Sequence, residues 1–396
     1  MNKGYKNIFL EKSGKNNMFS SKHYIPILKW KRGEYRALKG LRDKDKHDIT
    51  PLIELVMPTV QLYKDKKKTV KKSAEEMIKE MVIKFEEKRI LEIPKEILTS
   101  WGNQPIFVDF SLIYGTQPAI HLKIKALKSI ILAGISMGLK IIPVLNLNEE
   151  LEFKQELCSL SGKNNLGICL RVTSSDLSDM ANIKTLNDKI KNFLLIFNLN
   201  EKNIDLLIDI KEKNDQYSKY INASQTIMNL IKWRNFIFAS GAFPENLNGC
   251  KLDEQTLLPR MDWQEWVEHK KNKKLQRNPI FADYTIRNPI FIESLQYHSS
   301  TTSIKYTLEN DWLVMKGKKL DYPLYLVNAK LLVEDTKYFY GENFSSGDQY
   351  LAQKAKHYYK YIKNPSIKGT GRSEDWIAMG ISHHLALVVS QMANLS

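Results

Sequence analysis

Short apolar runs recur along the chain, and each is followed by polar residues and then by a stretch with helical spacing. The central runs are almost continuous in Ile, Leu, Val and Phe, which is typical of parallel strands buried on both faces. We expect eight strands, at residues 24–31, 49–56, 104–111, 140–148, 166–173, 193–200, 235–241 and 278–285. Eight strand–helix units in about 260 residues favour a (β/α)8 TIM-like barrel over the alternative, an open doubly wound sheet.

The spacing of apolar residues predicts helices between these strands, at 74–90, 120–138 and 220–234. After residue 290 the pattern changes. Residues 303–317 alternate between apolar and polar positions around a Glu-Asn-Asp turn, which predicts an antiparallel hairpin. Further helices are expected at 322–335, 347–363 and 373–393.

The change of pattern predicts three parts of the chain. They are an N-terminal extension (1–23), the barrel (24–290) and a C-terminal α+β appendage packed on the barrel (291–396). The apolar face of 377–392 could bury within the chain or across a dimer, and packing within the chain is the expectation.

Charge and composition narrow the setting. The net charge is +16 over 396 residues, which suits an acidic partner such as nucleic acid or nucleotide but also suits a lysine-rich solvated surface. The basic runs 64–72 and 269–277 lack interleaved aromatic residues, which favours solvated helix starts or loops. No apolar run reaches the length of a membrane span, the N-terminus lacks a signal-peptide core, and the three cysteines lie far apart. We therefore expect a cytoplasmic protein without a membrane partner.

The ends of the predicted strands carry the candidate chemistry, because ligand-contacting residues of a parallel barrel come from the C-terminal ends of its strands. Charged side chains inside apolar strands are costly unless they are paired. Four such positions are Lys29, Glu54, Asp109 and Arg171. The candidate catalytic residues are Glu54, Asp109 and Asp283, and the candidate ligand-binding residues are Lys29, Lys31, Glu34, Asn146, Arg171, Asn198 and Tyr284.

This set suits several chemistries. Lys29, Lys31 and Arg171 suit a ligand that bears phosphate or carboxylate. The three carboxylates suit one Mg²⁺ ion, although the sequence identifies no metal, or an acid/base pair for hydrolysis of a phosphodiester or glycoside. The alternative is a buried ion network that only closes the barrel mouth. The chain has no HExxH, GxSxG or P-loop motif, which argues against the corresponding hydrolases.

His383 and His384 are adjacent within a predicted helix. Neighbours in a helix point about 100° apart, so the two rings cannot bind one metal ion from one face. We expect one ring to be buried against the barrel and the other to be exposed.

Several segments together resemble the beta protein family of bacteriophages and bacteria. They are YIPILKWKRGEYRALKGL (24–41), ITPLIELV (49–56), ADYTIRNP (282–289), IKYTLENDWLVMKG (304–317), FSSGDQYL (344–351) and EDWIAMGISHHLALVVSQ (374–391). The resemblance implies a phage-defence or mobile-element setting, and it implies no particular reaction. It places Lys29, Lys31, Gly33, Glu34, Glu54, Asp109, Asp283, Tyr284, Ser346, Gly347, Asp348, Trp376, Gly380 and His384 at motif positions.

Two functional hypotheses follow. In the first, the barrel mouth binds a nucleotide or nucleic-acid end and hydrolyses it, with Lys29, Lys31 and Arg171 on the phosphate and Glu54 or Asp109 as acid or base. In the second, the chain is a non-catalytic sensor or binding module that recognises a phage component or partner protein and works with a separate effector.

Overall fold

The structure, a computed structural model, describes residues 19–59, 64–65, 68–69, 72–114, 119–177, 183–291, 301–366 and 368–395. Most of the predicted N-terminal extension, and residues 66–67 and 70–71 of the first basic run (64–72), lie outside these residues. The second basic run begins in the last turn of helix α10 and continues into the loop after it.

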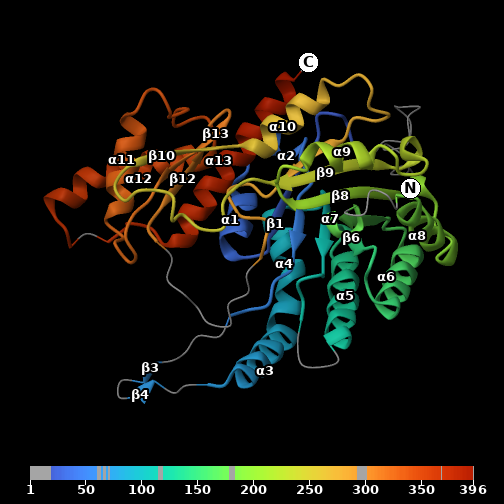
Figure 1. Ribbon diagram of the computed structural model, residues 1–396. Coiled ribbons are helices and arrows are strands. Elements are labelled where there is room, and N and C mark those ends of the chain that lie inside the picture. Colours follow the sequence, from blue (N-terminus) through green and yellow to red (C-terminus); the bar gives the residue numbers. More distant parts are fainter. Residues whose placement is uncertain are drawn as a thin grey trace, which may run out of the picture.

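Eight parallel strands close into a barrel in chain order, which confirms the predicted fold (Figure 1). The strands are β1 (Tyr24–Lys29), β2 (Leu52–Glu54), β5 (Pro105–Asp109), β6 (Lys140–Asn146), β7 (Ile168–Thr173), β8 (Ile204–Glu212), β9 (Asn235–Gly241) and β11 (Ile280–Asp283). Alternate residues of these strands, such as Ile25, Phe107 and Leu207, fill the barrel interior. The residues between them face the surrounding helices.

The prediction of the sixth strand was wrong. Residues 193–200 form the end of helix α8 (Ile183–Ile196) and the turn after it, and the strand is β8. The helix buries one stripe at three- and four-residue spacing, formed by Leu186, Ile190, Phe193 and Leu194. Leu195 and Ile196 are 68% and 69% exposed, so the apolar run is only half buried. Asn198 follows the helix in a left-handed conformation, and it lies before β8, at the end of the barrel opposite the mouth.

The remaining helices of the barrel layer include those predicted at 74–90 and 120–138, with changed bounds, and several that were not predicted. They are α1 (Arg32–Gly40), α2 (Asp43–Lys46), α3 (Ala74–Lys84), α4 (Ile90–Ser100), α5 (Ala119–Ser136), α6 (Leu151–Asn164), α7 (Ser174–Leu177), α9 (Tyr217–Ser224) and α10 (Met261–Lys270). A π-helical turn at Phe85–Arg89 joins α3 to α4. The helix predicted at 220–234 ends at Ser224, and only a short 3-10 turn, Leu230–Lys232, follows.

The appendage contains a three-stranded antiparallel sheet in the order β10–β13–β12, and three helices. The predicted hairpin is β12 (Ile304–Thr307) and β13 (Asp311–Met315), and the helices are α11 (Leu324–Glu334), α12 (Ser346–Lys363) and α13 (Ser373–Asn394). Strand β10 (Gln255–Pro259) comes from between β9 and β11, so this sheet takes a strand from the range predicted as barrel. A separate ribbon of two short strands, β3 (Lys64–Asp65) and β4 (Lys68–Thr69), precedes α3.

Helix α13 joins the appendage to the barrel (Figure 1). It packs against α1 and β1 as well as against α12 and β12. Its residues Ile381, Leu385 and Val388 belong to the same apolar cluster as Tyr24 and Leu28 of β1. The apolar face of 377–392 is therefore buried largely within the chain.

Both histidines of α13 are buried, so the expectation that one is exposed was wrong. His384 Nε2 lies 2.9 Å from Asp283 Oδ2, and His383 Nδ1 lies 2.9 Å from Asp348 Oδ2. The helix is buried on two sides, because the barrel covers one ring and the appendage covers the other. No helix among the described residues has the length and apolar character needed to cross a membrane.

Leu385→Ala is predicted to destabilise the whole chain by about 3 kcal/mol, because it leaves a cavity between α13 and the barrel. Leu331→Ala on α11, where the side chain is 46% exposed, is the control and should cost less than about 1 kcal/mol. Urea unfolding followed by circular dichroism measures both. Equal, small losses would show that α13 is not part of the barrel core.

Candidate functional site

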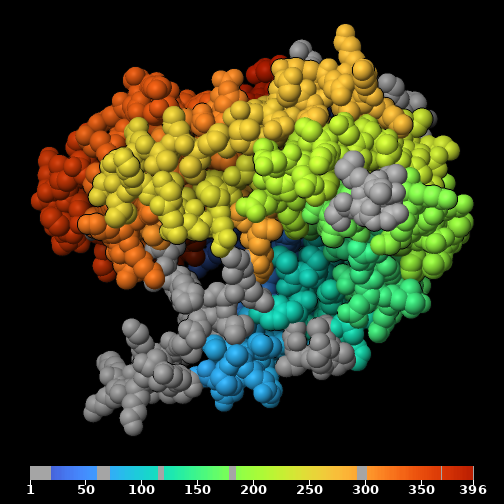
Figure 2. Space-filling view, viewed as in Figure 1, coloured from blue at the N-terminus to red at the C-terminus, as the bar shows by residue number. Residues whose placement is uncertain are grey.

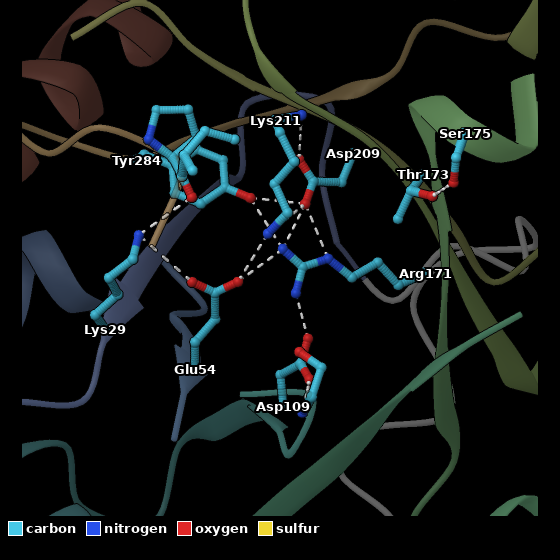
Figure 3. Close-up of polar contacts among 12 residues, drawn as sticks. Lys29, Glu54, Asp109, Arg171, Thr173, Ser175, Asp209, Lys211 and Tyr284 are labelled. Atoms are coloured by element: carbon cyan, nitrogen blue, oxygen red, sulfur yellow. Dashed lines mark hydrogen bonds and ion pairs between the residues drawn. The ribbon is translucent and has the colours of Figure 1, made fainter. Parts of the chain in front are cut away.

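The mouth of the barrel gathers buried charges from four strands (Figure 3). Glu54 ends β2, Asp109 ends β5, Arg171 lies in β7 and Asp209 lies in β8. Each follows an inward-facing apolar residue by two positions, so each side chain points into the barrel. All four side chains are at most 1% exposed.

The Arg171 guanidinium is the centre of this cluster. Its Nη2 lies 2.9 Å from Glu54 Oε1, its Nε lies 2.9 Å from Asp209 Oδ2, and its Nη1 donates to Asp109. Tyr284 Oη accepts from Nη2 at 2.9 Å and donates to Asp209 Oδ2 at 2.7 Å. All three guanidinium nitrogens are therefore engaged by the protein itself.

Two lysines complete the cluster, which we call the mouth ring: Lys29, Glu54, Asp109, Arg171, Asp209, Lys211 and Tyr284. Lys211 Nζ lies 3.0 Å from Glu54 Oε1 and 3.4 Å from Asp209 Oδ2. Lys29 Nζ lies 3.7 Å from Glu54 Oε2 and donates to the carbonyls of Asn288 and Pro289. Its three cations balance its three carboxylates, so the ring has no net charge.

The position of Lys211 depends on a backbone irregularity. The pairing of β8 with β9 shifts register between Asp209 and Glu212. Lys211 adopts a φ of 59°, which is uncommon for a residue other than glycine. Local strain of this kind persists only where the surroundings hold it. Here the ion pairs with Glu54 and Asp209 hold the lysine.

Burial and ion pairing set the protonation states of the ring. Burial by itself raises the pKa of Glu54, but the nearby cations, Lys211 first, outweigh it and lower this pKa to about 2. The pKa of Asp209 is lowered for the same reasons. Burial lowers the pKa of Lys29 to about 8 despite the opposing effect of Glu54. At pH 7 both carboxyls are thus ionised, and about a tenth of Lys29 is a neutral amine.

Asp283 does not join the ring. Ala282 and Tyr284 face the barrel interior, so Asp283 between them faces the helices. Tyr24 Oη donates to it at 2.5 Å, and the His384 ring contacts its other oxygen. The prediction that Asp283 lies at the mouth was wrong. It considered only that Asp283 ends its strand, and not which residues of that strand face the barrel interior.

A Mg²⁺ site of Glu54, Asp109 and Asp283 is not formed. Arg171 occupies the space between the first two, and the third lies outside the barrel. Within the part of the chain that the structure describes, no three His, Cys, Asp or Glu residues are grouped so as to hold a metal ion.

The other predicted residues lie at varying distances from the ring. Lys31 is exposed at the N-cap of α1, with its Nζ 4.9 Å from the centre of the Phe291 ring. Glu34 is buried in the first turn of α1 and accepts from Arg287 at 3.1 and 3.2 Å. Asn146 ends β6 and pairs in register with Arg171. Asn198 lies at the opposite end of the barrel.

The sequence reasoning missed Asp209 and Lys211. Both lie in the segment IDLLIDIKE (204–212), where Asp205, Leu207, Asp209 and Lys211 alternate with apolar residues. That period of two was a signal for a strand with a polar inner face. The strand was instead predicted at the more continuous apolar run just before this segment, which belongs to α8.

The family model described as "Beta protein" matches residues 24–390. The chain belongs to the beta protein family. No curated protein matches the chain. A solved structure titled "Crystal Structure of SacUVDE" is similar to it, with 9% identity, 67% of this chain and 94% of that chain covered, and a TM-score of 0.29. The barrel assignment therefore rests on the sheet topology of the chain itself.

In this member of the beta protein family, six of the residues that the resemblance placed at motif positions lie in two buried clusters. One is the mouth ring with Lys29, Glu54, Asp109 and Tyr284. The other lies between barrel and appendage, where Asp283 contacts His384, whose Nδ1 lies 2.9 Å from Thr307 Oγ1. The second cluster joins β11, α13 and β12, which gives it a role in holding the two parts together.

The lowered pKa of Glu54 predicts a specific pH dependence of stability. A group whose folded pKa is depressed from 4.5 to about 2 stabilises the fold fully above about pH 5 and progressively less as the pH falls. Glu54→Gln removes this contribution. The difference in unfolding free energy between wild type and this variant is therefore predicted to shrink by about 1 kcal/mol or more between about pH 6 and pH 3.5.

Urea unfolding at each pH measures this difference, and Glu152→Gln on the exposed face of α6 is the matched control. A wild-type-to-variant difference that stays constant or widens on acidification would contradict the assigned ionisation of Glu54.

Proposed function

We propose that the mouth of the barrel binds a phosphate-bearing ligand, such as a nucleotide or a nucleic-acid end, through the ammonium groups of Lys29, Lys31 and Lys211. The observation that supports this is the position of the lysines around Arg171, which is buried and already paired with carboxylates of the mouth ring. Lys31 is exposed beside this ring, with its Nζ 4.9 Å from the centre of the Phe291 ring, so a third ammonium group lies near those of Lys29 and Lys211. Ammonium groups in such positions are good donors to phosphate oxygens.

The shape of the molecule is compatible with this proposal. Figure 2 shows a hollow between the yellow segment that follows β9 and the cyan segment of β5 and α5. Lys211 is 28% exposed and Lys29 is 9% exposed, so the donors lie at increasing depth from the rim.

The protonation states favour binding over hydrolysis by a carboxyl pair. A carboxyl general acid needs a raised pKa to hold its proton at neutral pH, whereas Glu54 and Asp209 have lowered ones. Arg171 donates its hydrogen bonds to the carboxylates, so in this proposal it stabilises the site and does not contact the ligand. We therefore place recognition of the ligand first and hydrolysis second, with Lys29 as the ring amine that can exchange a proton near pH 8.

The proposed setting is the cytoplasm of a bacterial cell, in phage defence or on a mobile element. The bacterial and phage occurrence that the family resemblance implies supports this setting, and the net charge of +16 suits an anionic ligand. In the binding reading, the ligand-bound barrel would signal to a separate effector protein.

Lys31→Glu is predicted to weaken binding of a phosphate-bearing probe at least tenfold, because it replaces a rim donor by a repelling charge. The control is Lys232→Glu, which makes the same charge change on the exposed turn before β9, at the other end of the barrel. Titration calorimetry with pyrophosphate, ATP and a 5′-phosphorylated oligonucleotide measures the affinities, and chromatography of the mixtures measures turnover.

Equal weakening by both variants would show a diffuse charge effect and overturn the proposal, as would failure of all three probes to bind the wild type. Binding without turnover supports recognition as the function. Turnover that persists unchanged in Lys31→Glu would show that the reaction takes place elsewhere, and would contradict the proposed ligand site at the mouth.

A further inference from the structure

A second pocket lies where the barrel meets the appendage, with a volume of about 350 Å³. Its walls come from the loop after β9, the segment after β11, the β12–β13 hairpin and the first turn of α13. It is separate from the mouth ring. The carbonyls of Asn288 and Pro289 accept from Lys29 at the mouth, whereas Ile286 and Arg287, just before them, line the pocket.

Three cations line this pocket: Arg287, Lys305 and Lys316. Lys305 Nζ donates to the carbonyl of Ile286 at 3.3 Å, and Lys316 Nζ donates to the carbonyl of Cys250 at 3.0 Å. Among the described residues, no carboxylate lies within ion-pair distance of either lysine. Both ammonium groups thus retain donors for a ligand, although Glu245 also lines the pocket and Glu34 lies close enough to favour the charged form of Lys305.

Arg287 contributes a third donor. Its Nε and Nη2 both donate to Glu34 Oε1, which fixes the plane of the guanidinium. Its Nη1 makes no hydrogen bond to a described residue. A guanidinium held on one edge by a buried carboxylate is preorganised to bind an anion with its other edge.

The N-terminus of α13 also faces the pocket, through Ser373, Trp376 and Ile377. This helix has 22 residues, so its first turn carries the positive end of a long helix dipole, which Glu374 and Asp375 in the same turn offset in part. The segment that leads into it, GTGR (369–372), is set by Gly371 at a φ of 88°. Ser303 and Ser373 line the same space.

The clustering of the cations is energetically costly in the unliganded chain. Burial, with Arg287 adding repulsion, lowers the pKa of Lys305 to about 7. The lysine also lies 4.3 Å from the centre of the Phe243 ring, which holds its amine against the pocket wall. An anion in the pocket would offset this repulsion and favour the charged amine.

We propose that this pocket binds a small phosphate monoester, with its phosphate on Lys305, Lys316, the free edge of Arg287 and the first turn of α13. The organic part would lie against the apolar lining residues Leu247, Ile286 and Ile377. A volume of about 350 Å³ is at the lower end of the range for small-molecule pockets, so it suits a molecule the size of a nucleoside monophosphate and not a nucleic-acid strand. The site is independent of the ligand proposed for the mouth.

Lys305→Met and Lys316→Met test the pocket, with Lys318→Met, just after the β12–β13 hairpin, as the exposed control. The probes are AMP, adenosine and inorganic phosphate, titrated into the full chain by calorimetry. We expect AMP to bind at least tenfold more tightly than adenosine, and each pocket variant to weaken AMP at least tenfold. Lys318→Met and the mouth variant Lys31→Glu should leave the AMP affinity within about twofold.

The pH profile supplies a readout that a merely structural lysine would not produce. Between about pH 7 and pH 9 AMP stays a dianion, so the affinity of the wild type should fall as Lys305 loses its proton, and Lys305→Met should flatten this profile. Failure of AMP to bind, equal binding of adenosine, or loss of AMP binding in Lys31→Glu but not in Lys305→Met would overturn the pocket. The last outcome would leave the mouth proposal standing.

Discussion

A buried arginine paired with three carboxylates is the interaction on which the inner architecture of this barrel depends. Taking these four charges out of water costs several kcal/mol each, and only near-complete pairing offsets that cost. Arg171 meets this condition by engaging Glu54, Asp109 and Asp209 from three different strands. The strands are thereby held at a fixed register at the mouth, where a ligand would need a rigid site. The same pairing engages all three nitrogens of the arginine, which is why our proposal assigns ligand contact to the lysines around it.

The appendage covers part of the barrel and also forms a pocket with it. Helix α13 covers β1 and packs against α1, as the last helix of a barrel does, although it follows the inserted sheet and two further helices. Strand β10 leaves the barrel sequence to join that sheet. The pocket lined by Lys305 and Arg287 exists only because these parts interlock. Occupation of that pocket would therefore stabilise the junction and not the barrel alone.

Much of the fold followed from the sequence, because buried parallel strands carry a strong local signal. Seven strands, the hairpin and the helices of the appendage appear where apolar spacing placed them. The sixth strand was predicted at the wrong place because α8 ends in a more apolar run than β8 contains. Asp209 and Lys211, which lie in β8, were therefore missed. Asp283 was misplaced because neighbouring residues of a strand face opposite sides, so a shift of one position moves a side chain from the barrel interior to the helices. The junction pocket could not be predicted, since it depends on contacts between segments far apart in the chain.

The central claim is that the lysines at the mouth hold an anion above Arg171 and its paired carboxylates. A crystal structure with tungstate, whose anomalous scattering locates a phosphate-like anion without ambiguity, tests it most directly. The account predicts an ordered tungstate within hydrogen-bond distance of Lys31 and Lys211, with the Arg171 pairs intact beneath it. Tungstate bound only at scattered surface lysines, or bound by Arg171 after the carboxylates have moved away, would contradict the account.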